Sequence, residues 1–211
     1  MGFNDTTRDD GLSTLGSLRS LIPTRRCRFL EALRVAELQA SRLLDIYRIE
    51  EAPVPMELVS ELPRIEVQYR PIPMSGLSYW DGQNWVIGLN RAEPLTRQRF
   101  TLLHEYKHII DHGSVRNLYP GSGRTSAEQQ AEQAADYFAG CVLMPRKLLK
   151  RAWASGLQTP DQLARHFQTS ERAIGVRLAQ VGLVDRATRH GGKMTYHRAA
   201  HPASISKELA A

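Results

Sequence analysis

The feature that most constrains this chain is a His-Glu-x-x-His sequence inside a stretch with the pattern of a helix. It runs from His104 to His108, and residues 95–112 contain neither Gly nor Pro, which predicts one continuous helix. Residues four apart on a helix lie one turn above each other, so both imidazoles can face one cation. Zinc suits two such nitrogens, and Glu105 stands where it can take a proton from water. The sequence therefore predicts metal-assisted hydrolysis, usually of peptide bonds.

A five-residue motif can also arise by chance on an ordinary solvent-exposed helix. With 7 His in 211 residues, the pattern is expected in roughly 1% of such chains, so its context has to support it. Phe100, Leu103, Ile109 and Ile110 give the predicted helix one apolar, buried face. A third ligand is also available further along the chain.

A catalytic zinc site takes three protein ligands and keeps one position open for water. Metzincins carry a third His six residues after the second, but Ser114 stands there, so that class is excluded. The next helical pattern, residues 125–143, carries Glu132 and Asp136 four residues apart on one face. We predict Glu132 as the third ligand and Asp136 as the carboxylate that orients a ligand imidazole. Glu128, one turn earlier, is the alternative ligand, and Glu132 is then an ordinary exposed carboxylate.

Several segments of the chain together resemble the ImmA/IrrE metallopeptidases. They are Arg99–His108, Glu132–Ala139 and Val142–Pro145, with the short strand-like segments Met74–Tyr79 and Trp85–Asn90. The resemblance covers about residues 35–184. It implies a gluzincin-like zinc peptidase that relieves repression by cutting a helix-turn-helix repressor, often in stress responses or on mobile elements. It also implies His104, His108 and Glu132 as metal ligands and Glu105 as the general base.

Two positions depart from the family pattern without removing a ligand. Lys107 stands where the family commonly has a small or apolar residue. We expect its stem to lie on apolar surface with the amine in solvent; alternatively, the amine faces the metal and weakens binding. Asp136 replaces a frequent Asn.

Charge and cysteine content narrow the class of protein further. The formal net charge is +6, but residues 186–211 hold five basic groups against one acidic group. Most of the excess charge therefore lies in a tail that we expect to be disordered, and we do not expect direct nucleic-acid binding. The chain has no apolar run of about 18 residues and no signal-peptide core at its start. Cys27 and Cys141 are predicted to be reduced thiols, and we expect a cytoplasmic protein without membrane contact.

The pattern predicts an α+β fold. It consists of a mainly helical zinc-peptidase domain with a small, largely antiparallel three-stranded sheet, followed by a C-terminal helix-turn-helix-like unit. The segments are a flexible leader at 1–24, the metallopeptidase domain at 25–154, the helix-turn-helix-like unit at 155–185 and a disordered basic tail at 186–211. The expected strands are 65–69, 76–80 and 84–89, the last two forming a hairpin. The remaining expected helices are 25–49, 56–62, 145–154, 160–167 and 170–181.

Two smaller features concern the surroundings of the site. We expect an exposed edge strand to bind substrate backbone by strand addition. In the loop 113–124, Tyr119 is predicted to be a packed aromatic rather than an oxyanion donor.

The leading hypothesis is a cytoplasmic zinc endopeptidase, with manganese as an alternative ion. Its substrate is a regulatory protein, a helix-turn-helix repressor or an antitoxin, whose cleavage relieves repression. One alternative is a non-hydrolytic regulator that binds and sequesters its repressor. Another is a DNA-binding regulator that uses residues 160–181. Glu171, Arg172 and Arg177 are the polar groups of its second helix, where we expect protein packing or substrate recognition rather than base reading.

Overall fold

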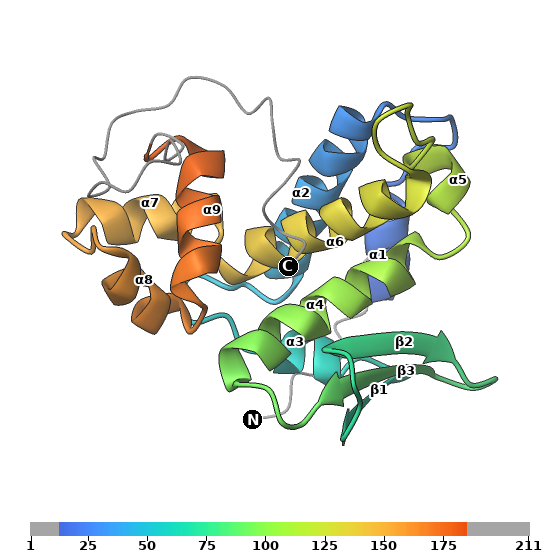
Figure 1. The fold of residues 1–211 in the computed structure, drawn as a ribbon, viewed down its shortest axis with the longest axis horizontal. Helices are drawn as coiled ribbons and strands as arrows, with labels where there is room; N and C mark the ends of the chain where they lie inside the picture. Colours follow the sequence, from blue (N-terminus) through green and yellow to red (C-terminus); the bar gives the residue numbers. More distant parts are fainter. Residues whose placement is uncertain (1–12, 185–211) are drawn as a thin grey trace.

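The His-Glu-x-x-His sequence lies in α4 (Leu95–Asp111), which crosses the middle of the molecule (Figure 1). The computed structural model describes residues 13–184, and all structural statements below concern that part of the chain. α4 packs between α6 (Ala127–Leu143) and a three-stranded sheet. The long helix predicted around the motif is therefore confirmed, and so is the α+β class.

The sheet is built from β1 (Ile65–Arg70), β2 (Gly76–Trp80) and β3 (Trp85–Asn90), in the order β1-β3-β2. β2 and β3 pair antiparallel, as expected for a hairpin, but β1 runs parallel to β3. The sheet is thus mixed, and the prediction that it is largely antiparallel is corrected. The physical reason is the burial of β3, the most buried strand. β3 lies at the centre of the sheet, between β1 and β2. These two edge strands are consecutive in the chain and run in opposite directions, so β3 is parallel to one and antiparallel to the other.

Helices cover only one face of this sheet in Figure 1. Beside α4 and α6, the helices are α1 (Thr14–Arg19), α2 (Phe29–Ile46), α3 (Glu57–Ser60), α5 (Val115–Leu118), α7 (Arg146–Ala154), α8 (Pro160–Phe167) and α9 (Glu171–Val181). Within residues 13–184, no helix combines the length and the apolar character needed to cross a bilayer. The expected tail at 186–211 lies outside the described residues.

Helix α1 was not predicted, because residues 1–24 were expected to form a flexible leader. That expectation is wrong for α1: Leu18 is fully buried, and Gln39 donates a hydrogen bond to its carbonyl at 3.1 Å. Ser13 caps the helix by accepting from the backbone N–H of Gly16. The signal was an apolar residue at every third position, with Leu15 before and Leu21 after Leu18, hidden among Ser, Thr and Gly.

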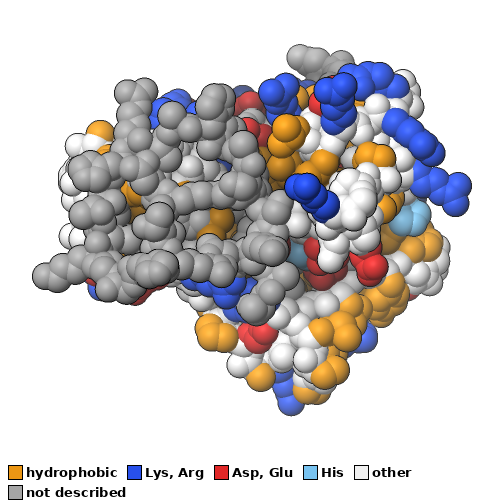
Figure 2. Space-filling view, turned by 45° about the horizontal axis from the view of Figure 1, so that its top comes forward, with side chains coloured by type: hydrophobic (Ala, Val, Ile, Leu, Met, Phe, Trp, Pro, Cys, Tyr) orange, Lys and Arg blue, Asp and Glu red, His pale blue; other side chains and the backbone are white. Residues whose placement is uncertain are grey.

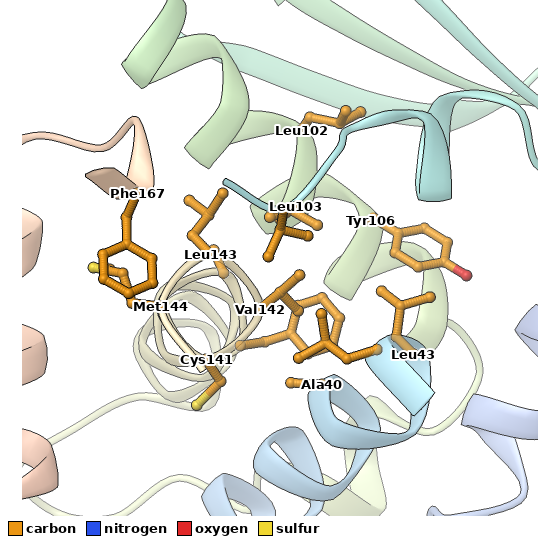
Figure 3. Packing of buried hydrophobic residues seen from close by; sticks show 14 of the residues in the cluster. Ala40, Leu43, Leu102, Leu103, Tyr106, Cys141, Val142, Leu143, Met144 and Phe167 are labelled. Atoms are coloured by element: carbon orange, nitrogen blue, oxygen red, sulfur yellow. The ribbon is translucent and has the colours of Figure 1, made fainter. Parts of the chain in front are cut away.

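One hydrophobic core joins the described elements around α4. Figure 3 shows Leu102, Leu103 and Tyr106 of α4 packed with Leu43 of α2 and Val142 of α6. The same cluster continues into the C-terminal helices through Leu163, Phe167, Ile174 and Leu178. The buried face of the motif helix is therefore held by α2, α6 and the C-terminal helices together.

Candidate metal centre

Three side chains that were predicted as ligands come together between α4 and α6. The Nε2 atoms of His104 and His108 lie 3.1 Å apart. Each Nε2 lies 3.2 Å from a carboxylate oxygen of Glu132. Among the described residues, these three form the group of side chains that could hold a metal ion. The alternative ligand Glu128 lines the neighbouring cleft but does not belong to this group.

The separations of these atoms fit a tetrahedral ion. For ligand bonds of about 2.0–2.1 Å, the edge of a tetrahedron measures about 3.3–3.4 Å. The two nitrogens lie 3.1 Å apart, and each lies 3.2 Å from a different oxygen of Glu132, Oε2 for His104 and Oε1 for His108, so all of these separations are close to that value. Two imidazole nitrogens so close together also need a proton or a cation between their lone pairs, so the donor set suits a divalent ion such as zinc.

Asp136 holds the first ligand from the side away from the other two. Its Oδ1 lies 2.8 Å from Nδ1 of His104, so Nδ1 carries the proton and Nε2 is free to bind an ion. Ala134 and Ala135, both fully buried, are small residues on the helix that carries both carboxylates. The sequence thus placed Asp136 in the role that its geometry supports.

The same contacts shift the pKa values of the site. Burial disfavours a charged His104, but hydrogen bonds with Asp136 and Glu132 outweigh it and raise the pKa of His104 to about 9. Hydrogen bonds from His104 and His108 hold the pKa of Glu132 far below its usual range. Glu132 is therefore an ionised carboxylate ready to act as a ligand.

Glu105 faces the edge strand β2, and two residues of that strand set its position. The hydroxyl of Ser78 donates a hydrogen bond to Oε2 of Glu105 at 2.7 Å. A Cβ atom added to Gly76 would lie 2.3 Å from Cγ2 of Thr101 and 3.3 Å from Cγ of Glu105. The glycine therefore lets β2 approach α4 closely beside the motif. Sequence reasoning missed Ser78 and Gly76, although strand alternation places both on one face.

Lys107 takes neither of the two positions expected for it. Its side chain is completely buried, and its amine forms an ion pair with Asp111, one turn further along α4. The hydroxyl of Tyr119 donates a second hydrogen bond to Asp111. The amine thus reaches neither solvent nor the metal ligands, because Asp111 binds it in the interior. Tyr119 is buried, as predicted for a packed aromatic.

A cleft of about 770 Å³ opens beside the three ligands. Its lining comes from the start of β2, from α4, from residues 124–136 before and within α6, from Leu143 at the end of α6, and from residues 169–173 before and within α9. His104, Glu105 and Glu132 all face it. Figure 2 shows acidic and histidine side chains close together near the middle of one face of the molecule. A polypeptide can therefore reach the candidate metal centre from solvent.

The C-terminal helices are anchored to this region by buried arginines. Arg99 of α4 donates to the carbonyl of Gln168 at the end of α8. Arg177 of α9 is buried and donates to the carbonyl of Met144 at 3.0 Å. Arg177 was one of three polar groups considered for DNA reading, and its burial removes it from any such surface.

The sequence profile of the IrrE N-terminal-like domain, a peptidase family, matches residues 63–179. The match spans more than half of the 211 residues, so the chain belongs to this family. No curated protein matches the sequence. Among solved structures, a transcriptional regulator from Mycobacterium tuberculosis is similar, with a TM-score of 0.58 and 16% identity. The similarity covers 85% of this chain but only 55% of the regulator; at this identity it concerns the fold.

Proposed function

We propose that this protein is a zinc-dependent endopeptidase that cuts a regulatory protein. The observation that carries the proposal is the grouping, on the wall of an open cleft, of two imidazole nitrogens 3.1 Å apart with the Glu132 carboxylate, whose two oxygens each lie 3.2 Å from one of these nitrogens. Membership of a peptidase family supports the same reaction class. Manganese is the alternative ion for the same donor set.

The residues of the site have separate roles in the proposed reaction. His104, His108 and Glu132 hold the ion, and Asp136 fixes the tautomer of His104 through its 2.8 Å hydrogen bond. A bound zinc ion supplies Lewis acidity, which lowers the pKa of water to about 7 and polarises the scissile carbonyl. Glu105 takes a proton from the attacking water and delivers it to the leaving amine.

The edge strand β2 is suited to hold the substrate backbone. β2 pairs only with β3 within the described sheet, so its outer edge presents unpaired backbone groups to an extended peptide. The start of β2 lines the cleft, and Ser78 on the same strand contacts Glu105. A peptide added to β2 therefore runs past the general base.

We propose a helix-turn-helix repressor or an antitoxin as the substrate, cut to relieve repression in a stress response or on a mobile element. This part of the proposal rests on the family resemblance. The alternative of a non-hydrolytic regulator that sequesters its repressor was based on the position of Lys107 beside a ligand. The amine of Lys107 is paired with Asp111 and lies away from the ligands.

Cleavage by a Glu105→Gln variant tests the reaction directly. Wild type and variant, both loaded with zinc, are incubated with a proteome-derived mixture of peptides, and the products are identified by mass spectrometry. We expect new termini with wild type, formed at least about 100-fold more slowly by the variant, because a general base contributes about 100- to 10,000-fold. Equal rates for the two proteins would contradict the mechanism.

A further inference from the structure

The face of α6 that carries the metal-site carboxylates continues to a glycine. Glu132, Asp136 and Gly140 follow each other at intervals of four residues, so they lie along one side of the helix. Gly140 is buried, yet a Cβ atom added to it would meet no atom within 4 Å. Unfilled space therefore lies beside Gly140, one turn beyond Asp136.

This space is a recess of about 20 Å³ between α4, α6 and α9. Its walls include the apolar side chains of Phe100, Met144, Ala173 and Val176. Phe100, Ala173 and Asp136 also line the large cleft, so the recess adjoins the cleft at the residue that orients His104. A volume of this size, about one water-sized probe, suits a methyl group better than a water, because its lining is mainly apolar.

We propose that this recess, which we call the Gly140 recess, binds a small aliphatic side chain of the substrate three or four residues from the bond that is cut. The inference rests on the proposed function and adds the class of residue that the site selects. Gly140 lies eight residues beyond the ligand Glu132 on α6, or about 12 Å along the helix, and neighbouring residues of an extended peptide lie about 3.3 Å apart. A substrate with its carbonyl at the metal centre therefore places a small side chain three or four residues away, such as that of Ala or Val, within reach of the recess.

The glycine itself supports this role. Glycine in a helix interior is less stable than alanine, and the space around Gly140 accepts the extra methyl group without collision. An alanine at position 140 would therefore stabilise the helix, but its methyl group would fill part of the recess. Glycine leaves the space open to a side chain that arrives from the cleft.

The chain offers a matched pair of variants for a test. Gly140→Ala places a methyl group in the recess. Gly175→Ala makes the same change within α9, where an added Cβ also meets no atom within 4 Å, and Gly175 lines neither the recess nor the cleft. Both variants should fold and bind zinc like wild type, which a zinc assay and thermal unfolding verify.

Mass spectrometry of a proteome-derived peptide mixture then gives the residues on both sides of each cut. Wild type and Gly175→Ala should favour Ala or Val at one position three or four residues from the cut. Gly140→Ala should lower cleavage of peptides with Val at that position, relative to peptides with Gly there, by about tenfold or more, because one methylene in a binding pocket changes selectivity by about that factor. Ala173→Val, which narrows the recess from α9, should act in the same direction. Unchanged profiles for Gly140→Ala and Ala173→Val, or no aliphatic preference in wild type, would overturn the inference.

A selection that needs no cleavage separates this inference from the proposed reaction. A displayed library of random peptides is selected on zinc-loaded Glu105→Gln protein, with and without Gly140→Ala. Enrichment of a small aliphatic residue that disappears with Gly140→Ala supports the recess even if wild type cuts no peptide. Cleavage without such enrichment would refute the recess and leave the peptidase proposal standing.

Discussion

At the scale of single residues, the grouping of the candidate ligands could be predicted from spacing, but their surroundings could not. His104, His108, Glu132 and Asp136 each follow from intervals of four residues on a helix, which fix a common face before any packing is known. The contact of Ser78 with Glu105 depends on how β2 lies against α4. Strand alternation gives the face of Ser78 but not the element that covers it.

Lys107 marks the limit of residue-level reasoning most clearly. Its position beside a ligand suggested that the amine lies in solvent or faces the metal. Instead, the amine pairs with Asp111, one turn away, and stays in the interior. A buried charge that loses its partner costs about 3–5 kcal/mol. Lys107→Met should therefore lower the free energy of unfolding in urea by about that amount.

Two comparisons test the ion pair. The double variant Lys107→Met/Asp111→Asn should be more stable than Lys107→Met alone, because no uncompensated charge remains. Lys147→Ala, at an exposed position of α7, should change stability by less than about 0.5 kcal/mol. A rise in zinc affinity with Lys107→Met would instead show that the amine acts on the metal.

Ser78 is predicted to be a positioning residue for Glu105. Ser78→Ala removes the 2.7 Å hydrogen bond to Oε2 and should lower the rate of peptide cleavage by about tenfold, with zinc content unchanged. Ser78→Thr keeps the hydroxyl and should restore most of the rate. The rates are measured on one peptide from the cleavage screen. Equal rates for wild type and the alanine variant would show that Ser78 does not position Glu105.

At the scale of elements, strong hydrophobic periodicity located most helices and all three strands. Three features escaped it: α1, which is only 6 residues long, the 4-residue helix α5 within the expected loop 113–124, and the parallel pairing of β1 with β3. Strand direction depends on which strand occupies the centre of the sheet, and that is decided by burial against α4. Arg19 of α1 shows why the short helix matters, since it donates to the carbonyls of Ile109 and Ile110 near the end of α4.

These bonds satisfy carbonyl groups at the C-terminus of the motif helix, where a positive charge is also favourable. Arg19→Ala should therefore lower the free energy of unfolding by about 1–2 kcal/mol. Hydrogen exchange of the α4 amides should accelerate in the same variant. Arg116→Ala, at an exposed position of α5, is the control, and an effect of equal size there would argue against a specific cap.

At the scale of the whole molecule, the predicted boundary near residue 155 is not visible in the packing of the core. One hydrophobic cluster includes Phe167 of α8 together with Leu102 and Leu103 of α4. A helix-turn-helix-like pattern specifies two helices and their turn, but it does not specify whether they pack on a neighbouring domain. We therefore expect residues 13–184 to unfold as one cooperative unit.

Phe167→Ala should lower the global stability by about 3–5 kcal/mol, because it opens a cavity in the shared core. Far-UV circular dichroism and zinc release should report the same single transition. Arg165→Ala, on the exposed side of α8, should have little effect. Loss of the C-terminal helices in a separate, earlier transition would show that they form an independent unit.

The most direct test of the metal centre is the zinc content of the purified protein after dialysis against trace zinc. We expect about one zinc ion per wild-type chain, because the two imidazole nitrogens and the Glu132 carboxylate already lie close enough together to share one ion. Glu132→Ala should lose the ion or hold it far more weakly, whereas Glu128→Ala, one turn earlier on α6, should keep it. Wild type without tightly bound zinc, or equal retention by Glu132→Ala, would contradict the three-ligand site.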